Sequence, residues 1–191
     1  MEEQGIGGEF FASSRPAFLH AGGLTPAQRG TVLHRFMQYA DYSAAADDVQ
    51  KELDRLQLQG IFTQQESGIL PVDAVHRFFR SETGQRMLRS PLLLREKRFA
   101  MEMDVRTLYP ELPDNAAGET VVIQGMVDCA FLEDGKLYVV DYKTDREPPD
   151  VLRTRYKTQL TVYKTAMEQC TDYPVGGVLL YSFHNHCTIE I

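Results

Sequence analysis

The chain has 191 residues, of which 43% are hydrophobic and 25% charged, and its formal net charge at pH 7 is −7. This composition is typical of a globular domain with a sizeable core and excludes a disordered chain. The acidic balance argues against a free-standing DNA-binding domain, which is usually basic. It leaves open a catalytic domain that receives DNA from neighbouring domains.

The bulk sequence also bears on location. No apolar run is long enough to cross a membrane, so no membrane partner is expected. The acidic amino terminus lacks an apolar signal core, which argues against export. The three cysteines, Cys129, Cys170 and Cys187, are widely spaced and form no Cys-x-x-Cys pair. This spacing fits a reducing, cytoplasmic location without disulfides.

The first ninety residues are predicted to be mostly helical. Residues 1–24 hold several glycines and no clear period, so we interpret them as a tail or linker ahead of one domain over 25–191. The first helix is predicted at 24–40, with Thr25 and Gln28 forming a capping box. Further helices are predicted over 47–60, 70–81 and 81–90.

Strands dominate from residue 92 onward. A strand is predicted at 92–105, and two more, at 121–133 and 136–144, flank the Asp134-Gly135 pair, a strong hairpin signal. The remaining elements are a long helix at 151–170 and strands at 175–183 and 186–191. This order predicts an α/β or α+β fold with a mixed central sheet flanked by helices.

Asp141 and Lys143 end an apolar, β-branched strand. Side chains alternate along a strand, so both residues point to the same face. A buried charge is costly unless it is paired or binds a metal. The two residues therefore form either a structural ion pair or part of a site, and Asp-x-Lys taken alone favours the ion pair.

Asp128 changes that preference, because the tight turn brings it beside Asp141. Two adjacent carboxylates repel each other, and a divalent cation relieves the repulsion. Carboxylate oxygens suit Mg²⁺ or Mn²⁺. The ammonium of Lys143 can hold an attacking water or steady a developing negative charge. Gly125, three residues before Asp128, leaves room for another backbone or a ligand. Together these features favour metal-dependent phosphodiester hydrolysis.

The motif GMVD (125–128) followed by VVDYKTD (139–145) resembles the active-site hairpin of the PD-(D/E)xK nuclease superfamily. The likeness is greatest to its RecB-like branch, and there to the carboxy-terminal nuclease domains of AddA-type helicase–nuclease subunits. RGTVLH (29–34) resembles the first helix of that branch. YKTQLTVYKTAM (156–167) resembles its Q-x-x-x-Y motif, and LLYSF (179–183) resembles its last strands. Five pieces in the right order make the resemblance specific.

The resemblance implies a restriction-endonuclease-like core with a helical amino-terminal part. It implies that Asp128 and Asp141 are metal ligands and that Lys143 is the catalytic lysine. His34 and the main-chain carbonyl of Tyr142 would complete the coordination. The implied cofactor is Mg²⁺, with Mn²⁺ as a possible substitute.

Gln159 and Tyr163, four residues apart on one helix face, would by resemblance brace the site or contact the DNA strand. Glu96 stands where related nucleases often place an acid, and its role is left open. Simpler interpretations remain for two of these assignments. His34 also fits a hydrogen-bonded histidine at the core edge, and Gln159 with Tyr163 fits an ordinary amphipathic pair. The other histidines are interpreted as surface or packing residues.

The implied function is that of a Mg²⁺-dependent DNA exonuclease domain of an ATP-dependent helicase–nuclease. It would hydrolyse the 3′-ended strand during recombinational repair of double-strand breaks. The implied partners are DNA, the helicase domains of the same subunit, to which residues 1–24 would link, and a second, AddB-like subunit. Some relatives hold an iron–sulfur cluster on four cysteines. With three cysteines spaced differently, we expect none here.

Two alternatives remain. The first is a catalytically silent nuclease fold that binds a DNA end or a partner subunit. Such copies usually lose an acid or the lysine, whereas Asp128, Asp141 and Lys143 are all present. The second is a sequence-specific endonuclease, which would usually require a basic recognition helix or arm that this sequence lacks.

Overall fold

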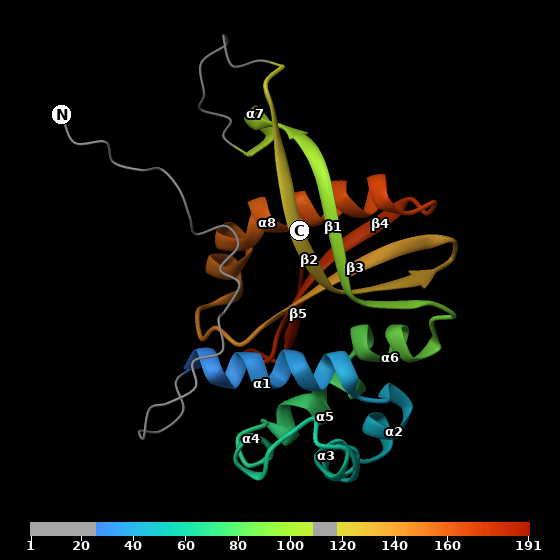
Figure 1. Ribbon diagram of the computed structural model, residues 1–191, viewed down its shortest axis with the longest axis vertical. Helices are drawn as coiled ribbons and strands as arrows, with labels where there is room; N and C mark the ends of the chain where they lie inside the picture. The colour runs from blue at the N-terminus through green and yellow to red at the C-terminus, as the bar shows by residue number, and fades with distance from the viewer. Residues whose placement is uncertain (1–25, 109–117) are drawn as a thin grey trace, which may run out of the picture.

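The computed structural model describes residues 26–108 and 118–191 (Figure 1). The tail predicted over residues 1–24 lies outside the described residues. So does Thr25, one of the two residues of the predicted capping box. Helices pack on both faces of a central sheet (Figure 1). Among the described helices, none is long and apolar enough to cross a membrane.

The helices are α1 (Pro26–Tyr39), α2 (Tyr42–Asp47), α3 (Val49–Leu58), α4 (Gln64–Ser67), α5 (Val72–Arg80), α6 (Glu82–Arg89), α7 (Val105–Leu108) and α8 (Pro149–Cys170). The strands are β1 (Leu93–Asp104), β2 (Thr120–Glu133), β3 (Lys136–Lys143), β4 (Val175–Ser182) and β5 (Cys187–Glu190).

The sheet is mixed, in the order β1-β2-β3-β4-β5. Neighbouring strands are antiparallel except for β3 and β4, which run parallel. Parallel neighbours need a long crossover, and α8 supplies it. The prediction of a mixed central sheet flanked by helices, with a helical amino-terminal part, is therefore confirmed.

The two faces of the sheet bury separate apolar clusters. One cluster joins the amino-terminal helices to one face of the sheet, and the other joins α8 to the opposite face. Strand β3 contributes to both, because alternate side chains point to opposite faces. Val140 and Tyr142 enter the first cluster, whereas Leu137 and Val139 enter the second. This strand is buried on both faces, which explains its nearly continuous apolar sequence.

The predicted hairpin between β2 and β3 is confirmed. Glu133 pairs with Lys136, so the turn contains only Asp134 and Gly135. Their φ angles are 49° and 75°. Positive φ at both central residues belongs to a turn whose twist matches that of the strands, which explains why Asp-Gly is favoured there.

The structure contains three short helices, α2, α4 and α7, that the sequence did not predict. In α2, the Asp41 side chain accepts a hydrogen bond from the N–H of Ala44, and α4 is a single turn closed by a capping box of Thr63 and Glu66. Helices this short have no apolar period to detect, since their stability comes from caps and packing. Asp48 ends α2 and caps α3 in extended conformation, so the helix predicted over 47–60 begins later than expected.

Ser81 caps α6, accepting a hydrogen bond from the N–H of Gly84. Gly84 is packed against the end of α5. A Cβ at this position would overlap the carbonyl oxygen of Phe78 and lie 2.9 Å from its carbonyl carbon. Because the obstructing atoms belong to the backbone, a side-chain rotation cannot relieve the clash.

We therefore expect Gly84→Ala to lower the free energy of unfolding by about 2 kcal/mol or more, as overpacking does in closely packed cores. Gly68→Ala is the matched control, since its Cβ would lie 3.6 Å from its nearest neighbours and its φ is −67°. That variant should be neutral or slightly stabilising. Urea unfolding of both variants measures the difference, and equal stabilities would refute the close contact.

Candidate metal site and its lysine

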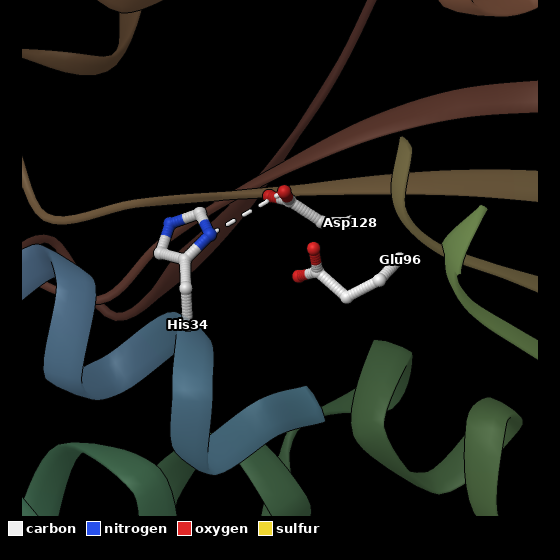
Figure 2. Close-up of side chains that lie close together, drawn as sticks. All are labelled: His34, Glu96 and Asp128. Atoms are coloured by element: carbon white, nitrogen blue, oxygen red, sulfur yellow. Dashed lines mark ion pairs between the residues drawn. The ribbon is translucent and has the colours of Figure 1, made fainter. Parts of the chain in front are cut away.

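His34, Glu96 and Asp128 come from three different elements and converge on one point (Figure 2). One potential ligand atom from each residue lies within 4.8 Å of those from the other two. The residues belong to α1, β1 and β2 respectively. Residues far apart in the sequence therefore form a compact group of two carboxylates and one imidazole, called here the acidic cluster.

The position of Asp128 follows from the way the hairpin opens. The pairing of β2 with β3 ends at Cys129 and Val140. Beyond that pair, the N–H of Tyr142 donates to Oδ2 of Asp128 at 2.8 Å. The carboxylate thus satisfies a backbone donor that the strand ladder no longer reaches, and the bond fixes its orientation.

Glu96 is brought into the cluster by an inversion of the backbone. Its φ is 50° inside β1, which is uncommon for a residue other than glycine. The ladder pairs Arg95 with Cys129 and Lys97 with Val127, so Glu96 and Asp128 lie opposite each other where regular pairing is interrupted. Such backbone strain costs about 1–3 kcal/mol and is concentrated at functional sites.

The ring of His34 contacts Tyr142 and Asp128. Nε2 lies 3.0 Å from the carbonyl oxygen of Tyr142, and Nδ1 lies 3.3 Å from Oδ1 of Asp128. A carbonyl oxygen only accepts, so Nε2 is the donor in the first contact. Burial opposes a charged ring, but Asp128 outweighs it and raises the pKa of His34.

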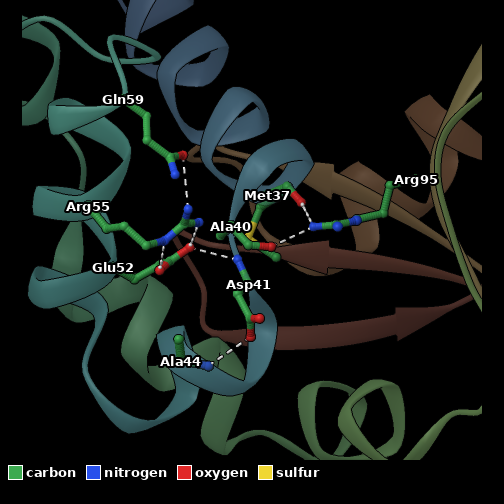
Figure 3. A network of polar contacts seen from close by, with 8 residues as sticks. All are labelled: Met37, Ala40, Asp41, Ala44, Glu52, Arg55, Gln59 and Arg95. Carbon is green, nitrogen blue, oxygen red and sulfur yellow. Dashed lines mark hydrogen bonds and ion pairs between the residues drawn. The ribbon is translucent and has the colours of Figure 1, made fainter.

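Close approach of α1 to the sheet places His34. Gly30 lies one turn before His34 on the same helix face, and a Cβ there would lie 3.4 Å from Oγ1 of Thr144. The guanidinium of Arg95 donates to the carbonyl oxygen of Ala40 at 2.6 Å, at the end of α1 (Figure 3). Because Arg95 directly precedes Glu96, one short segment of β1 both holds α1 and presents an acid.

A second contact continues this support into α3 (Figure 3). The N–H of Asp41 donates to Oε1 of Glu52 at 2.7 Å. Glu52 also receives two hydrogen bonds from Arg55, at 2.5 and 2.7 Å. The carboxylate is almost fully buried and satisfied by these donors, so the chain leaving α1 has a fixed path.

Asp141 and Lys143 form the ion pair that strand alternation predicts, with Nζ 2.9 Å from Oδ2. Asp141 is only 1% exposed. Burial raises its pKa to about 6, with Asp128 adding to the rise and Lys143 opposing it. Apart from the ion pair, Oδ2 accepts no hydrogen bond from the described residues. This oxygen has spare capacity for a cation.

The charges of the other groups complement this arrangement. Burial opposes ionisation of Asp128, but His34 outweighs it and lowers the pKa of Asp128. Burial also opposes the ammonium of Lys143, yet Asp141 and Asp128 raise its pKa, so it stays charged at neutral pH. Asp128 and Asp141 interact electrostatically, as predicted, although Asp141 lies outside the three-residue acidic cluster.

Tyr156 was not singled out from the sequence. Its ring lies under Lys143, with Nζ 4.3 Å from the ring centroid, and its hydroxyl donates to Asp145 at 3.1 Å. Cation–π contact of this kind restricts the ammonium. The signal that points to Tyr156 is its spacing, three residues before Gln159 on the face of α8 that carries the predicted pair.

Gln159 and Tyr163 contact each other. Nε2 of Gln159 donates to the Tyr163 hydroxyl at 2.7 Å, and the Tyr163 ring packs edge-on against Phe99. Burial raises the pKa of Tyr163, and Asp141 and Asp128 raise it further, which places this tyrosine near the acids. Tyr163 therefore joins the buried cluster on the α8 face of the sheet, and the hydrogen bond attaches Gln159 to it.

The donor set suits a hard divalent cation. Carboxylate oxygens with one imidazole match Mg²⁺ and Mn²⁺ better than soft metals, which prefer thiolates. The buried Asp141 oxygen with spare capacity lies beside this group. The residues present thus fit a metal site, and Glu96, whose role the sequence left open, belongs to the cluster.

Comparison with known proteins gives a consistent result. A family model described as the PD-(D/E)XK nuclease superfamily matches residues 12–190. The chain is 35% identical over 183 residues to the A-type subunit of the ATP-dependent helicase/nuclease of Bacillus licheniformis, covering 88% of this chain and 15% of that protein. It is 36% identical over 174 residues to the corresponding protein of Acetivibrio thermocellus, covering 88% and 14%. The chain therefore spans about 15% or less of these relatives.

Removing a cluster carboxylate should weaken metal binding without unfolding the domain. We expect Glu96→Gln and Asp128→Asn each to lower Mn²⁺ affinity by about tenfold to a hundredfold in calorimetric titrations. The amide oxygen that Asp128→Asn introduces can still accept from the N–H of Tyr142, so the hairpin should persist. Glu102→Gln, an exposed change on the same strand as Glu96, is the matched control and should bind normally.

Low pH should weaken the binding of Mn²⁺ to the proposed site. Burial raises the pKa of Asp141 to about 6 and, with help from Asp128, also raises that of Glu96. The raised pKa of His34 acts in the same direction, because a metal requires the neutral ring. Mn²⁺ affinity measured at constant ionic strength should fall with decreasing pH, most steeply near pH 6. Constant affinity from about pH 8 to 5 would contradict these ligands.

Proposed function

The chain belongs to the PD-(D/E)XK nuclease superfamily, and we propose that it is a Mg²⁺-dependent DNA exonuclease domain of an ATP-dependent helicase–nuclease. The observation that carries the proposal is the acidic cluster lying beside the Asp141–Lys143 ion pair. The names of these relatives join helicase and nuclease in one subunit, which supports a helicase–nuclease as the setting of the reaction.

In the proposed site, His34, Glu96 and Asp128 hold the ion together with Asp141 and the main-chain carbonyl of Tyr142. A bound Mg²⁺, or Mn²⁺ in its place, would supply Lewis-acid chemistry toward the phosphodiester. The N–H of Tyr142 orients the Asp128 carboxylate, and its carbonyl oxygen already faces the His34 ring. The protein thus contributes a preformed set of oxygen ligands.

Lys143 is proposed as the catalytic lysine. Its raised pKa keeps the ammonium charged, so it can donate hydrogen bonds to the attacking water or to the phosphoryl oxygens as negative charge develops. Asp141 and the Tyr156 ring hold the ammonium from two sides. Gln159 and Tyr163 would brace this arrangement from α8, through their mutual hydrogen bond.

The wider role is proposed for the longer protein. DNA unwinding, degradation of the 3′-ended strand and repair of double-strand breaks by recombination would require helicase domains and a second, AddB-like subunit. The net charge of −7 supports this division of labour, since those parts would provide most phosphate contacts. The cytoplasm is the compartment proposed for such DNA processing.

The proposal is tested by incubating the chain with end-labelled single-stranded DNA in Mg²⁺ or in EDTA. We expect metal-dependent shortening, and Lys143→Ala should reduce the rate by at least about a hundredfold, as loss of a charge-stabilising donor does. Lys136→Ala, an exposed change on the same strand, is the matched control. The fragment pattern from each labelled end gives the polarity.

Cleavage by Lys143→Ala at the rate of the unmodified chain would refute the catalytic lysine. If the isolated chain cuts nothing, the same pair of variants is compared in a full-length helicase–nuclease, where motor activity reports correct folding. Loss of cutting with intact unwinding in Lys143→Ala, but not in Lys136→Ala, would then support the proposal.

A further inference from the structure

We propose that the chain holds a second phosphate of the substrate strand in an open hollow on α5 and the turn between β4 and β5. This α5 hollow has a volume of about 610 Å³, and its lining includes His76, Arg77, Arg80, Ser81, Tyr181 and His186. The inference rests on the proposed function for the identity of the strand as DNA. The hollow is separate from the acidic cluster and shares no residue with it.

Two exposed arginines give the hollow its charge. Arg77 and Arg80 belong to the last turn of α5, and neither side chain makes a hydrogen bond or ion pair within residues 26–108 and 118–191. Asp73 is the one acid in the lining, and no ion pair joins it to either arginine. In a chain of net charge −7, two adjacent guanidinium groups without acidic partners are available to an anion.

A buried tyrosine lines the same space. Tyr181 is 1% exposed, yet its hydroxyl has no hydrogen-bond partner of full geometry among the described residues. Burial raises the pKa of Tyr181, and the nearby Ser81 hydroxyl opposes that rise. Ser81 itself already donates to the carbonyl oxygen of Phe78 at 2.6 Å. A buried donor left unpaired is costly, and a phosphate oxygen in the hollow would pair it.

Two histidines border the hollow and extend its donor set. His76 lies on α5, and His186 lies in the turn after β4. His186 has a φ of 53°, an uncommon backbone conformation of the kind found at ligand sites. Burial, together with Arg77 and His184, lowers the pKa of His186, which reports an electropositive setting that an anion would relieve.

The α5 hollow is lined by a residue of the strand next to the one that carries Lys143. Tyr181 pairs in register with Tyr142, and Ser182 pairs with Lys143. Asp128 lies two strands from β4, a separation of roughly 10 Å at normal strand spacing. Strand β3 therefore lies between the strand that lines the hollow and the strand that carries Asp128.

The donor chemistry favours phosphate over a carboxylate on a protein partner. Two guanidinium groups, a phenol and two imidazoles offer donors from several directions, and a phosphodiester presents acceptor oxygens in a tetrahedral arrangement. A carboxylate offers two oxygens in one plane, which a single arginine satisfies. An acidic peptide is therefore the ligand expected to compete with phosphate if the hollow binds a protein instead.

The test measures binding of a fluorescein-labelled oligothymidylate in EDTA, where no cutting occurs. We expect Arg77→Ala/Arg80→Ala to weaken binding at least about tenfold and to reduce the slope of log affinity against log salt by about 0.7, the value for one phosphate on a single strand. The matched control is Lys51→Ala/Arg153→Ala, which removes two exposed charges outside the hollow. It should change affinity less than twofold.

Tyr181→Phe removes only the hydroxyl. This variant should weaken binding several-fold, leave the salt slope unchanged and unfold at the same temperature as the unmodified chain or a higher one, because its buried hydroxyl is unpaired. Normal DNA affinity in Tyr181→Phe would overturn the inference. An equal loss of affinity in the two double variants would also overturn it, since the effect would then be general charge attraction.

Inorganic phosphate supplies a readout that does not depend on nuclease function. Its titration, followed by NMR of the histidine ring protons, should shift His76 and His186 in the unmodified chain but not in Arg77→Ala/Arg80→Ala. If neither the chain nor the full-length helicase–nuclease binds or cuts DNA while these shifts occur, the proposed function fails and the phosphate site stands. The absence of shifts, or displacement of phosphate by a glutamate-rich peptide at lower concentration, would overturn the site.

Discussion

The hydrogen bond from the backbone of Tyr142 to the carboxylate of Asp128 is the contact on which the candidate site depends. It forms where β2 and β3 stop pairing, so it serves two purposes. It satisfies a backbone donor that the opened hairpin would otherwise bury, and it orients an acid that the sheet alone would leave free to rotate. The neighbouring carbonyl of Tyr142 faces His34, so one peptide segment aligns residues from α1 and β2.

The site concentrates charge in a place where charge is costly. Asp141 is almost fully buried, and among the described residues only Lys143 forms an ion pair with it. A buried pair of this kind contributes little to stability, because desolvation opposes the Coulombic gain. The separate shifts of the pKa values, down for Asp128 and up for Asp141, divide the two acids into one that is readily ionised and one that retains its proton more tightly.

The sequence predicted those features that follow from local alternation or from a motif. Strand β3, the Asp-Gly turn and the pairing of Asp141 with Lys143 were all expected from residue order. Only the family resemblance pointed to Glu96, and residue order alone could not place it, because its position depends on a left-handed backbone conformation within a strand. The α5 hollow also escaped prediction: the sequence indicates only that Tyr181 is a core aromatic residue, and the packed structure shows that its hydroxyl lacks a partner. Helices α2, α4 and α7 were missed because helices this short have no apolar period to detect.

The interruption at Glu96 and Asp128 divides the longest ladder of the sheet into two zones. Regular pairing resumes on both sides in the same register, so the inversion introduces no slip. The outer zone extends beyond the rest of the sheet toward α7 (Figure 1). Fraying of the β1–β2 pair that starts in the outer zone meets a break in the ladder at Glu96 and Asp128. It meets this break before it reaches the inner zone, where β2 also pairs with β3. The strained residue therefore acts as a boundary between two units of local opening, and the acids lie on that boundary.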